Sequence, residues 1–401
     1  MATDGGSGPA IPLARWADRR LRLLAKETGS PRIAALDGAT IVGERGANGG
    51  YVIGGRISAG IGGSRLMPAA DGGWFALTLI RAEDRELLPA LFLDAGLDIR
   101  DNDAIAAAVA RHDCADLLMR GRLLGLPVAS ADEAPPSPPV EVMTRGPHRK
   151  RPAGHRPLVV DLSAIWAGPL IGHLLWLAGA EVVKVESPTR PDLIRRDDPA
   201  TFDLINQGKA SATVDFTDAA HKAALIALIR RADFVIESSR VRALRHLGID
   251  AGALVRETPG LVWLSVTGHG ATGEASDWTG IGNDCGVAAG LSRALADASG
   301  EIGYVGDAIA DPLTGITGAI EGWRAYGSGQ ARRIGLAMSA ITARALQEER
   351  EHDPAALHAE LHAWGAALGQ KFPYVRRREM FAPVRKPGAD TARYFPAIVP
   401  C

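Results

Sequence analysis

The chain has 401 residues, 46% of them hydrophobic, which is enough for about two domains with cores of their own. Its 45 basic and 46 acidic residues nearly cancel, and this balance argues against nucleic acid or an anionic membrane as a partner. The three cysteines, Cys114, Cys285 and Cys401, lie far apart and predict neither a disulfide framework nor a zinc site, so we expect a reducing, cytoplasmic location.

The chain begins with an N-terminal segment, residues 1–50, and a small α+β domain, residues 51–134. The first residues lack the basic-then-apolar pattern of a secretion signal, and no apolar run in the chain approaches the length of a membrane span. A glycine-rich run at residues 58–64 precedes the predicted elements of the small domain. Strand, helix, helix and strand are predicted, in this order, at residues 74–80, 83–95, 103–125 and 128–130.

Residues 135–156 are predicted to link the two domains. This stretch is rich in proline and then basic, and proline lacks the N–H donor that helices and central strands need. We therefore expect an extended connection in solvent. Its basic residues, Arg149, Lys150 and Arg151 among them, are expected to be solvated, although they could also approach an anionic ligand.

Strands and helices alternate through residues 157–346, the predicted large domain. Short apolar strands are predicted at residues 158–162, 181–185, 211–215, 234–237 and 261–266. Pro169 lies near the start of the first intervening helix and Gly179 lies just past its end. Near-continuous apolar strands separated by helices predict an α/β fold with a doubly wound, mainly parallel, Rossmann-like sheet. In the tail, residues 347–401, a helix is expected near residues 355–368.

Asp311 is the candidate catalytic residue. It follows an apolar run and precedes a helix-like stretch, and a carboxylate at such a junction is ionised at neutral pH and can act as a covalent nucleophile. The local sequence alone favours a plainer role, because Asp is a preferred N-cap and Pro312 a preferred first helical residue. The segments that surround it favour the nucleophile instead.

Gly268, Gly270 and Gly273 match the spacing of the dinucleotide fingerprint and follow a predicted strand. That fingerprint also needs a helix N-terminus immediately afterwards and an acidic residue at the end of the next strand. Here residues 274–280 have the composition of a loop. The chain is therefore not expected to bind NAD or FAD, and no metal site is expected.

Short motifs follow one another along the large domain, at residues 159–169, 179–186, 206–211, 232–237, 247–248, 266–270 and 306–311. In this order they resemble the class III CoA-transferase family, of the CaiB/BaiF and formyl-CoA transferase type. The match extends over residues 157–346. Several ordered motifs together are much more specific than any one of them alone.

The resemblance implies a reaction and a role for Asp311. This carboxylate would attack the carbonyl carbon of an acyl-CoA to form a mixed anhydride, and the released CoA would then form an aspartyl-CoA thioester. An acceptor carboxylate would finally take over the CoA. Main-chain N–H groups of a glycine loop would stabilise the oxyanions. The implied partners are acyl-CoA and a carboxylic acid, with CoA as substrate and no tightly bound cofactor, and family members are homodimers.

The resemblance also implies a groove for CoA at the carboxyl ends of the parallel strands. The residues matched to this groove are Ile165, Trp166, Ala167, Lys184, Ser187, Lys209, Ser238, Ser239 and His246. Simpler roles stay open, since Lys209 could be a solvated loop lysine and Trp166 could serve packing alone. Ser238 and Ser239 replace the family's usual Asn-Phe, and His246 replaces a common arginine, so the contacts with CoA could be weaker.

The family's small domain normally follows the large one, whereas residues 73–134, which resemble it, come first here. The chain therefore looks permuted, or like a shortened tandem fusion. The glycine run at residues 58–64 then takes the place of the family's active-site glycine loop, with Gly62 and Gly63 as candidate contacts. A plain flexible loop is the alternative, because glycine supplies turn conformations in many loops.

Two other functions stay open. The fold also resembles that of α-methylacyl-CoA racemases, which deprotonate the carbon next to the thioester with a His and an Asp. The racemase histidine would fall near Asn283 and Asp284, and asparagine cannot act as that base, although His269 lies nearby in the sequence. The rearranged order and the altered groove residues also fit a non-catalytic binding or partner protein.

Overall fold

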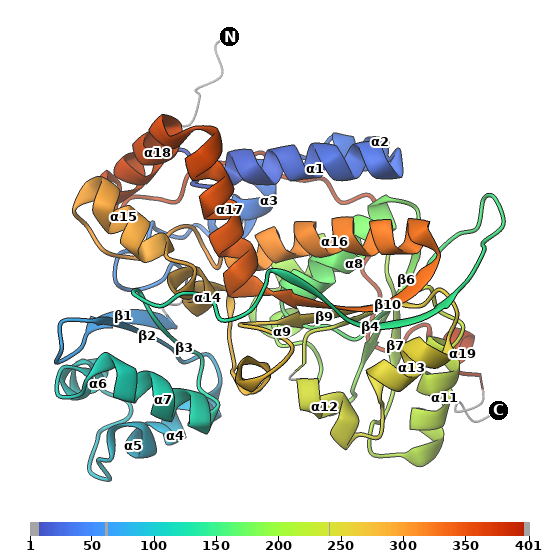
Figure 1. Cartoon of the computed structure of the whole chain (residues 1–401), viewed down its shortest axis with the longest axis horizontal. Helices are drawn as coiled ribbons and strands as arrows, with labels where there is room; N and C mark the ends of the chain where they lie inside the picture. Colours follow the sequence, from blue (N-terminus) through green and yellow to red (C-terminus); the bar gives the residue numbers. More distant parts are fainter. Residues whose placement is uncertain (1–7, 61–62, 240, 397–401) are drawn as a thin grey trace.

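The computed structural model describes residues 8–60, 63–239 and 241–396 and has a seven-stranded sheet at its centre (Figure 1). The strand order is β4-β10-β9-β8-β5-β6-β7, and every neighbouring pair is parallel except β10 with β4. The strands are β4 (Val140–His148), β5 (Leu158–Asp161), β6 (Glu181–Glu186), β7 (Ala210–Thr213), β8 (Phe234–Glu237), β9 (Val262–Thr267) and β10 (Gln330–Ala337). The predicted α/β class with a mainly parallel sheet is confirmed.

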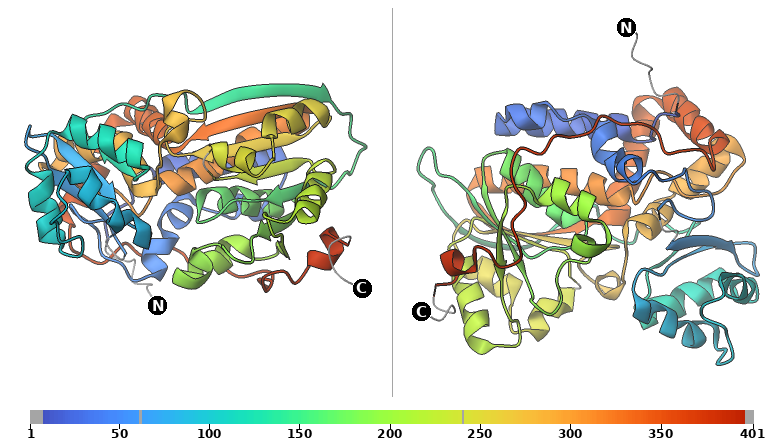
Figure 2. Two further views of the ribbon diagram at one scale, coloured as in Figure 1. Left: turned by 90° about the horizontal axis from the view of Figure 1, so that it is seen from below. Right: turned by 180° about the vertical axis from the view of Figure 1, so that it is seen from behind.

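Helices cover both faces of this sheet (Figure 2). On one face α16 (Ala310–Ser328) packs along α8 (Ala167–Leu177), and α1 (Ala14–Thr28) packs on α16. On the other face lie α11 (Ala219–Ile229) and α13 (Ala251–Glu257). Alternate strand residues enter the two separate apolar cores, which is why the strands are almost continuously apolar in sequence.

The N-terminal segment and the helices after β10 belong to the same layer. α2 (Pro31–Ala34) contacts α8, and α3 (Gly38–Asn48) contacts α16. Their buried side chains share one apolar core with the sheet, as do those of α17 (Met338–His352) and α18 (Pro354–Ala366). α17 runs across the boundary expected at residue 346, so the helical layer has no break there.

Residues of the tail bind main-chain groups of β7, the strand at one edge of the sheet. It returns along the molecule to α19 (Thr391–Tyr394) (Figure 2). There the Ser211 N–H donates to Asp390 Oδ2 at 2.9 Å, and the Thr213 N–H donates to Thr391 Oγ1 at 3.0 Å. Main-chain donors of the edge strand β7 are thus satisfied without a further strand.

The small domain has its own antiparallel sheet, seen at the lower left of Figure 1. β1 (Ser64–Pro68) pairs with β2 (Trp74–Thr78), which pairs with β3 (Val128–Ser130). Its helices are α4 (Ala82–Glu86), α5 (Leu88–Phe92), α6 (Asn102–Val109) and α7 (Cys114–Leu124). Each helix predicted here is therefore divided in two. Pro89 falls in the first turn of α5, and Asp113 is the N-cap of α7.

Shorter elements complete the large domain. They are α9 (Ile194–Asp197), α10 (Pro199–Asn206), α12 (Val241–His246), a 3-10 helix (Glu274–Asp277), α14 (Gly282–Ala288) and α15 (Leu291–Ser299). α14 contacts β2 and β3 and so connects the large domain with the small one. Within the described ranges, no helix combines the length and the apolar composition that a membrane crossing requires.

The stretch expected to be a bare linker contains a strand of the sheet. β4 lies antiparallel to β10, with Val142 opposite Ile334 and Val140 opposite Leu336. The expectation of an extended connection in solvent therefore does not hold for residues 140–148. The dense prolines end at Pro139, and β4 is an edge strand, where a missing N–H is tolerated.

Gly146→Ala is expected to lower the free energy of unfolding by about 1–3 kcal/mol, the usual cost of extra atoms in a packed site. A Cβ at this position in β4 would lie 1.9 Å from the carbonyl oxygen of Val255. Urea unfolding measures the difference. Gly327→Ala is the matched control, because an added Cβ there meets no atom within 4 Å. Equal stability of the two variants would mean that β4 does not pack as described.

Candidate active site

A cavity opens at the carboxyl ends of β5, β8 and β9. Ligand sites of open α/β sheets lie at this edge. Loops after these strands and the first residues of α8 and α16 form its walls. Its lining is mainly hydroxyl-bearing and apolar, and Asp311 is the one carboxylate among the described residues that line it.

Asp311 is 6% exposed in the wall of this cavity. Its Oδ1 accepts a hydrogen bond from the main-chain N–H of Ala167 at 3.2 Å. The main-chain N–H of Gly282 is a second donor to the carboxylate. The first residues of α8, α14 and α16 therefore meet at one carboxylate, and a helix N-terminus is the end that favours negative charge.

Burial raises the pKa of Asp311 from 3.8 to about 7. The hydrogen bond from Ala167 and the charge of Arg45 favour the ionised form and lower this pKa, whereas Asp307 raises it. A carboxylate with an ordinary pKa was expected from the sequence. In the folded chain the carboxyl instead titrates near neutral pH, a property that clusters at functional sites.

The backbone packs closely around the Asp311 carboxylate. Gly282 must be glycine, because a Cβ there would lie 2.0 Å from Asp311 Oδ2 and 2.6 Å from the carbonyl oxygen of Ala308. Ala308 has a φ of 46° and Ile165 a φ of 70°, in the left-handed region that such residues rarely adopt. Backbone strain of this kind clusters at ligand sites. Here it occurs in the two loops that carry Asp311 and its donor Ala167.

Arg45, from α3 of the N-terminal segment, contributes positive charge to this region. Its Nη1 donates to Asp307 Oδ1 at 2.8 Å, and its Nε donates to Asp198 Oδ2 at 3.1 Å. The guanidinium also lies 5.7 Å from the centre of the Trp166 ring, in cation–π contact. A segment outside the predicted large domain therefore helps to set the charge of the site.

Asn283 and Asp284, in the first turn of α14, connect the small domain to the site through hydrogen bonds. Asn283 Oδ1 accepts the Ala308 N–H at 3.0 Å, and its Nδ2 donates to Ser64 Oγ at 3.2 Å. Asp284 Oδ1 accepts the Thr78 hydroxyl at 3.3 Å. The Ser64 and Thr78 hydroxyls lie 2.9 Å apart. These side chains join β1 and β2 to the loop that precedes α16.

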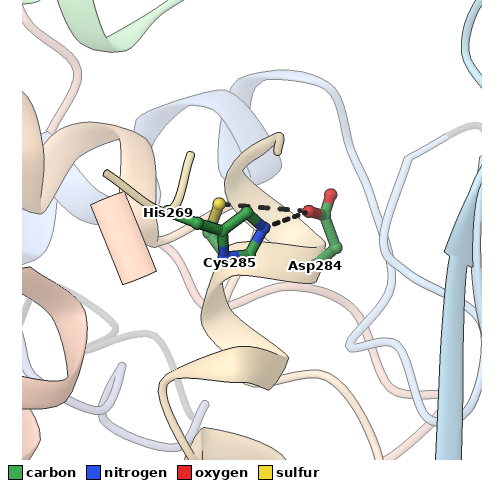
Figure 3. Close-up of side chains that lie close together, drawn as sticks. All are labelled: His269, Asp284 and Cys285. Atoms are coloured by element: carbon green, nitrogen blue, oxygen red, sulfur yellow. Dashed lines mark hydrogen bonds and ion pairs between the residues drawn. The ribbon is translucent and has the colours of Figure 1, made fainter. Parts of the chain in front are cut away.

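His269, Asp284 and Cys285 form a buried polar group (Figure 3). Their side-chain N, O and S atoms lie within 4.8 Å of one another, so by distance alone they could hold a metal ion. Burial, however, lowers the pKa of His269 to about 3 and raises the pKa of Asp284 to about 8. Burial also raises the pKa of the Cys285 thiol. Metal ligation needs the deprotonated thiol and carboxylate, which this environment disfavours.

Residues 157–368, just over half of the chain, match the family model described as CoA-transferase family III. The chain belongs to CoA-transferase family III. The matched part contains strands β5 to β10, the cavity and Asp311. The resemblance seen in the sequence motifs is confirmed.

Curated relatives of this family match the chain in part. A succinate–glutarate CoA-transferase of Agrobacterium fabrum is 32% identical over 214 residues, which are 49% of this chain and 53% of the relative. A succinyl-CoA–D-citramalate CoA-transferase of Chloroflexus aurantiacus is 33% identical over 144 residues, 34% of this chain and 36% of the relative. The chain thus spans about half the length of the first relative and about a third of the second.

Two solved structures also overlap the chain in part. A CaiB/BaiF family protein of Brucella suis is 28% identical with a TM-score of 0.41, covering 50% of this chain and 56% of that one. A hypothetical protein of Mycobacterium tuberculosis is 27% identical with a TM-score of 0.45, covering 52% of this chain and 61% of that one.

Of the residues matched to the family's CoA groove, Ile165, Ala167, Ser238 and Ser239 line the cavity. The Ser238 hydroxyl accepts the N–H of Ala164 at 3.0 Å, which joins the loops after β5 and β8. The structure therefore brings these four residues together beside the candidate nucleophile.

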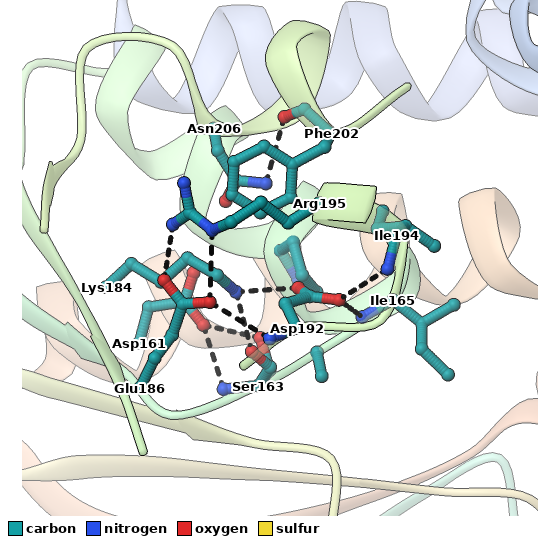
Figure 4. Close-up of polar contacts among 12 residues, drawn as sticks. Asp161, Ser163, Ile165, Lys184, Glu186, Asp192, Ile194, Arg195, Phe202 and Asn206 are labelled. Atoms are coloured by element: carbon teal, nitrogen blue, oxygen red, sulfur yellow. Dashed lines mark hydrogen bonds and ion pairs between the residues drawn. The ribbon is translucent and has the colours of Figure 1, made fainter. Parts of the chain in front are cut away.

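The two lysines matched to the CoA groove are only 2% exposed and do not line the cavity. Lys209 Nζ donates to Asp161 Oδ2 at 2.8 Å. Lys184 Nζ lies 2.9 Å from Asp192 Oδ2 (Figure 4). Asp192 Oδ1 in turn accepts the N–H of Ile165 at 3.1 Å. Both ammonium groups are thus used to neutralise buried carboxylates that shape the loop after β5. Direct contact of these lysines with CoA stays a prediction.

The remaining matched residues do not line the cavity. Trp166 is buried at the N-cap of α8, Ser187 directly follows β6, and His246 is exposed at the end of α12. Gly63 directly precedes β1 and accepts a main-chain hydrogen bond of 2.8 Å from the residue after β2. Gly62 lies outside the described residues.

Sequence reasoning missed Arg45, Gly282 and the role of Thr78. Arg45 and Thr78 belong to no motif, so only the folded chain shows that they reach the site. Gly282 lies two residues after Gly280 and directly before Asn283, and this pair of glycines was the one available signal.

Asp284→Asn is expected to make stability less sensitive to pH. The pKa of Asp284 is raised from 3.8 to about 8, so the folded chain keeps a proton that the unfolded chain releases. The free energy of unfolding therefore falls as pH rises through this interval, and the fall should be smaller in the variant. Thermal unfolding across the same interval is the measurement. Exposed Asp297→Asn is the control, and an unchanged pH dependence in Asp284→Asn would contradict the prediction.

Proposed function

We propose that the chain transfers CoA from an acyl-CoA to a carboxylic acid, with Asp311 as the covalent nucleophile. The observation that carries this proposal is a carboxylate in the cavity wall with main-chain donors from Ala167 and Gly282. Family membership supports the same reaction class, since the curated relatives are CoA-transferases by name.

The first half-reaction replaces the donor acid by Asp311. A carboxylate oxygen of Asp311 attacks the thioester carbon, the C–S bond breaks, and CoA leaves as the thiolate. The thiolate then attacks the aspartyl carbonyl of the mixed anhydride. This step releases the donor acid as its carboxylate and leaves an aspartyl-CoA thioester.

The second half-reaction reverses these two steps, with the acceptor acid in place of the donor acid. The acceptor carboxylate attacks the aspartyl thioester, the thiolate leaves again, and a new mixed anhydride forms. The thiolate attacks the acceptor's acyl carbon, which gives the new acyl-CoA and restores the Asp311 carboxylate. No proton is gained or lost over the cycle, so the reaction needs no further acid or base.

Each attack puts negative charge on an oxygen next to Asp311. The N–H groups of Ala167 and Gly282 are fixed at the starts of α8 and α14, and preorganised main-chain donors stabilise such oxyanions. Ile165, Ser238 and Ser239 are proposed to line the path of the CoA substrate, which would bind without a resident cofactor.

Racemisation is less well supported by the geometry. The Asn283 side chain lies near the position expected for the racemase histidine. Its amide nitrogen and its amide oxygen are both already hydrogen-bonded. His269 is buried and is not among the described residues that line the cavity. Asp311 is the sole titratable side chain in that described lining, so a second base is missing.

From the resemblance we further infer that the protein is a cytoplasmic homodimer. Light scattering measures its oligomeric state.

Incubation with a panel of acyl-CoA esters, followed by quenching with hydroxylamine, is expected to leave a hydroxamate on Asp311. Adduct formation should increase as the pH of the incubation rises through about 7, because only the ionised carboxylate attacks and burial holds the pKa of Asp311 there. Intact mass and peptide mapping provide the measurement. Asp311→Asn should give no adduct, and Asp297→Asn should react like the parent. A parent chain that is never modified would favour the non-catalytic binding protein.

Gly282→Ala is expected to slow adduct formation by about a hundredfold or more, the usual effect of displacing an oxyanion donor. The added Cβ would occupy the position of Asp311 Oδ2, 2.0 Å away. Gly286→Ala in the same helix is the matched control, because its Cβ would come no closer than 3.6 Å to another atom. Rates are compared by quenched mass spectrometry after thermal unfolding shows that both variants are folded. Two variants as fast as the parent would contradict the assigned geometry.

A further inference from the structure

A second, open cavity lies on a different part of α8. α2, the start of α3, α8 and residues 376–381 of the tail enclose it. His173 and Leu177 are its contacts on α8. They follow Ala167 by six and ten residues, so the cavity is about 9 to 15 Å along the helix from the donor to Asp311.

The tail forms a fixed wall of this cavity. Thr40 Oγ1 lies 3.2 Å from the carbonyl oxygen of Arg376, and Gln207 Oε1 accepts the Phe381 N–H at 2.7 Å. Between these points Arg378 forms two hydrogen bonds with a buried glutamate of α3. The main chain that carries Arg376 and Arg377 is therefore held beside the cavity without help from a ligand.

Three arginines that line the cavity carry positive charges that no carboxylate neutralises within the described residues. Arg32, Arg376 and Arg377 have no carboxylate partner in the described parts of the chain. Two carboxylates also line the cavity. The Asp37 oxygens accept the N–H and the hydroxyl of a threonine at the start of α3, and Glu379 is exposed, as are the three arginines. Free guanidinium groups therefore predominate, and their planar donor sets suit phosphate oxygens.

His173, which lines the cavity, has an unused donor. Its Nε2 lies 2.8 Å from Arg378 Nη1, and because a guanidinium can only donate, Nε2 is the acceptor and the ring proton is on Nδ1. Nδ1 is buried and has no hydrogen-bond partner. Burial, together with the charge of Arg378, lowers the pKa of His173 and keeps the ring neutral. Buried donors are rarely left unpaired, so an acceptor is missing here.

Phe381 adds a flat apolar surface at the same place. The ring lines the cavity and is 60% exposed. The Arg32 guanidinium lies 5.9 Å from the centre of this ring and 5.5 Å from that of Trp176. An exposed aromatic ring next to free guanidinium groups suits a ligand that carries both a planar base and phosphates.

We propose that this cavity binds a nucleotide, with its phosphates on Arg32, Arg376 and Arg377 and its base against Phe381. The site is separate from Asp311 and does not rest on the proposed CoA transfer. A free nucleotide and the nucleotide end of a CoA ester share this chemistry.

Isothermal titration calorimetry of the full chain with ADP, inorganic pyrophosphate and adenosine tests the proposal. ADP should bind once per chain, pyrophosphate more weakly, and adenosine not measurably. The double variant Arg376→Gln, Arg377→Gln should weaken ADP binding by at least about tenfold, since a charge-assisted hydrogen bond is worth that factor. Arg350→Gln, at an exposed arginine outside the cavity, is the control. Phe381→Ala should weaken binding of ADP but not of pyrophosphate.

Competition with CoA distinguishes the two sources of the nucleotide. If CoA displaces ADP from the parent chain and the double variant binds neither well, the site holds the nucleotide end of CoA. If ADP binds equally with CoA present, the ligand is a free nucleotide. ADP binding that is absent at millimolar concentration, or equal in the parent and the double variant, overturns the proposal.

Discussion

The site depends on one constraint, the burial of a carboxylate where main-chain N–H groups can still reach it. Burial alone would keep Asp311 protonated. The donor Ala167 is 144 residues away in the chain, so the parallel sheet has to align the loop after β5 with the start of α16. Gly282 is then the residue that leaves room for the carboxylate. The geometry of these loops, rather than any single side chain, lets main-chain donors reach the buried carboxylate.

The same constraint accounts for how the small domain is attached. α14 carries both a donor to Asp311 and the side chains of Asn283 and Asp284, which bind Ser64 and Thr78. Any movement of the small domain would therefore be transmitted to the helix that positions the carboxylate. The early position of this domain in the chain does not prevent it from reaching the site.

The fold was largely predictable, because buried parallel strands are almost continuously apolar and each is followed by a helix. β4 was not, since its pattern is weak and its neighbours are prolines and arginines. Ordered motifs led to Asp311 as the candidate nucleophile, and this role stays a prediction. The contact of Lys209 with Asp161, 48 residues earlier, could not be read from the sequence, because only the fold brings the two side chains together. Arg45 was not found at all, since a contact made across the whole chain leaves no local signal.

The attachment of the tail to β7 has a consequence for self-association. An open edge strand is a template on which another molecule can add a strand. Here the donors of Ser211 and Thr213 are occupied by side chains of Asp390 and Thr391, which cannot continue a ladder as a strand would. Loss of the last dozen or so residues, for example by proteolytic trimming, would uncover these donors and leave the native sheet open to growth into fibres or aggregates.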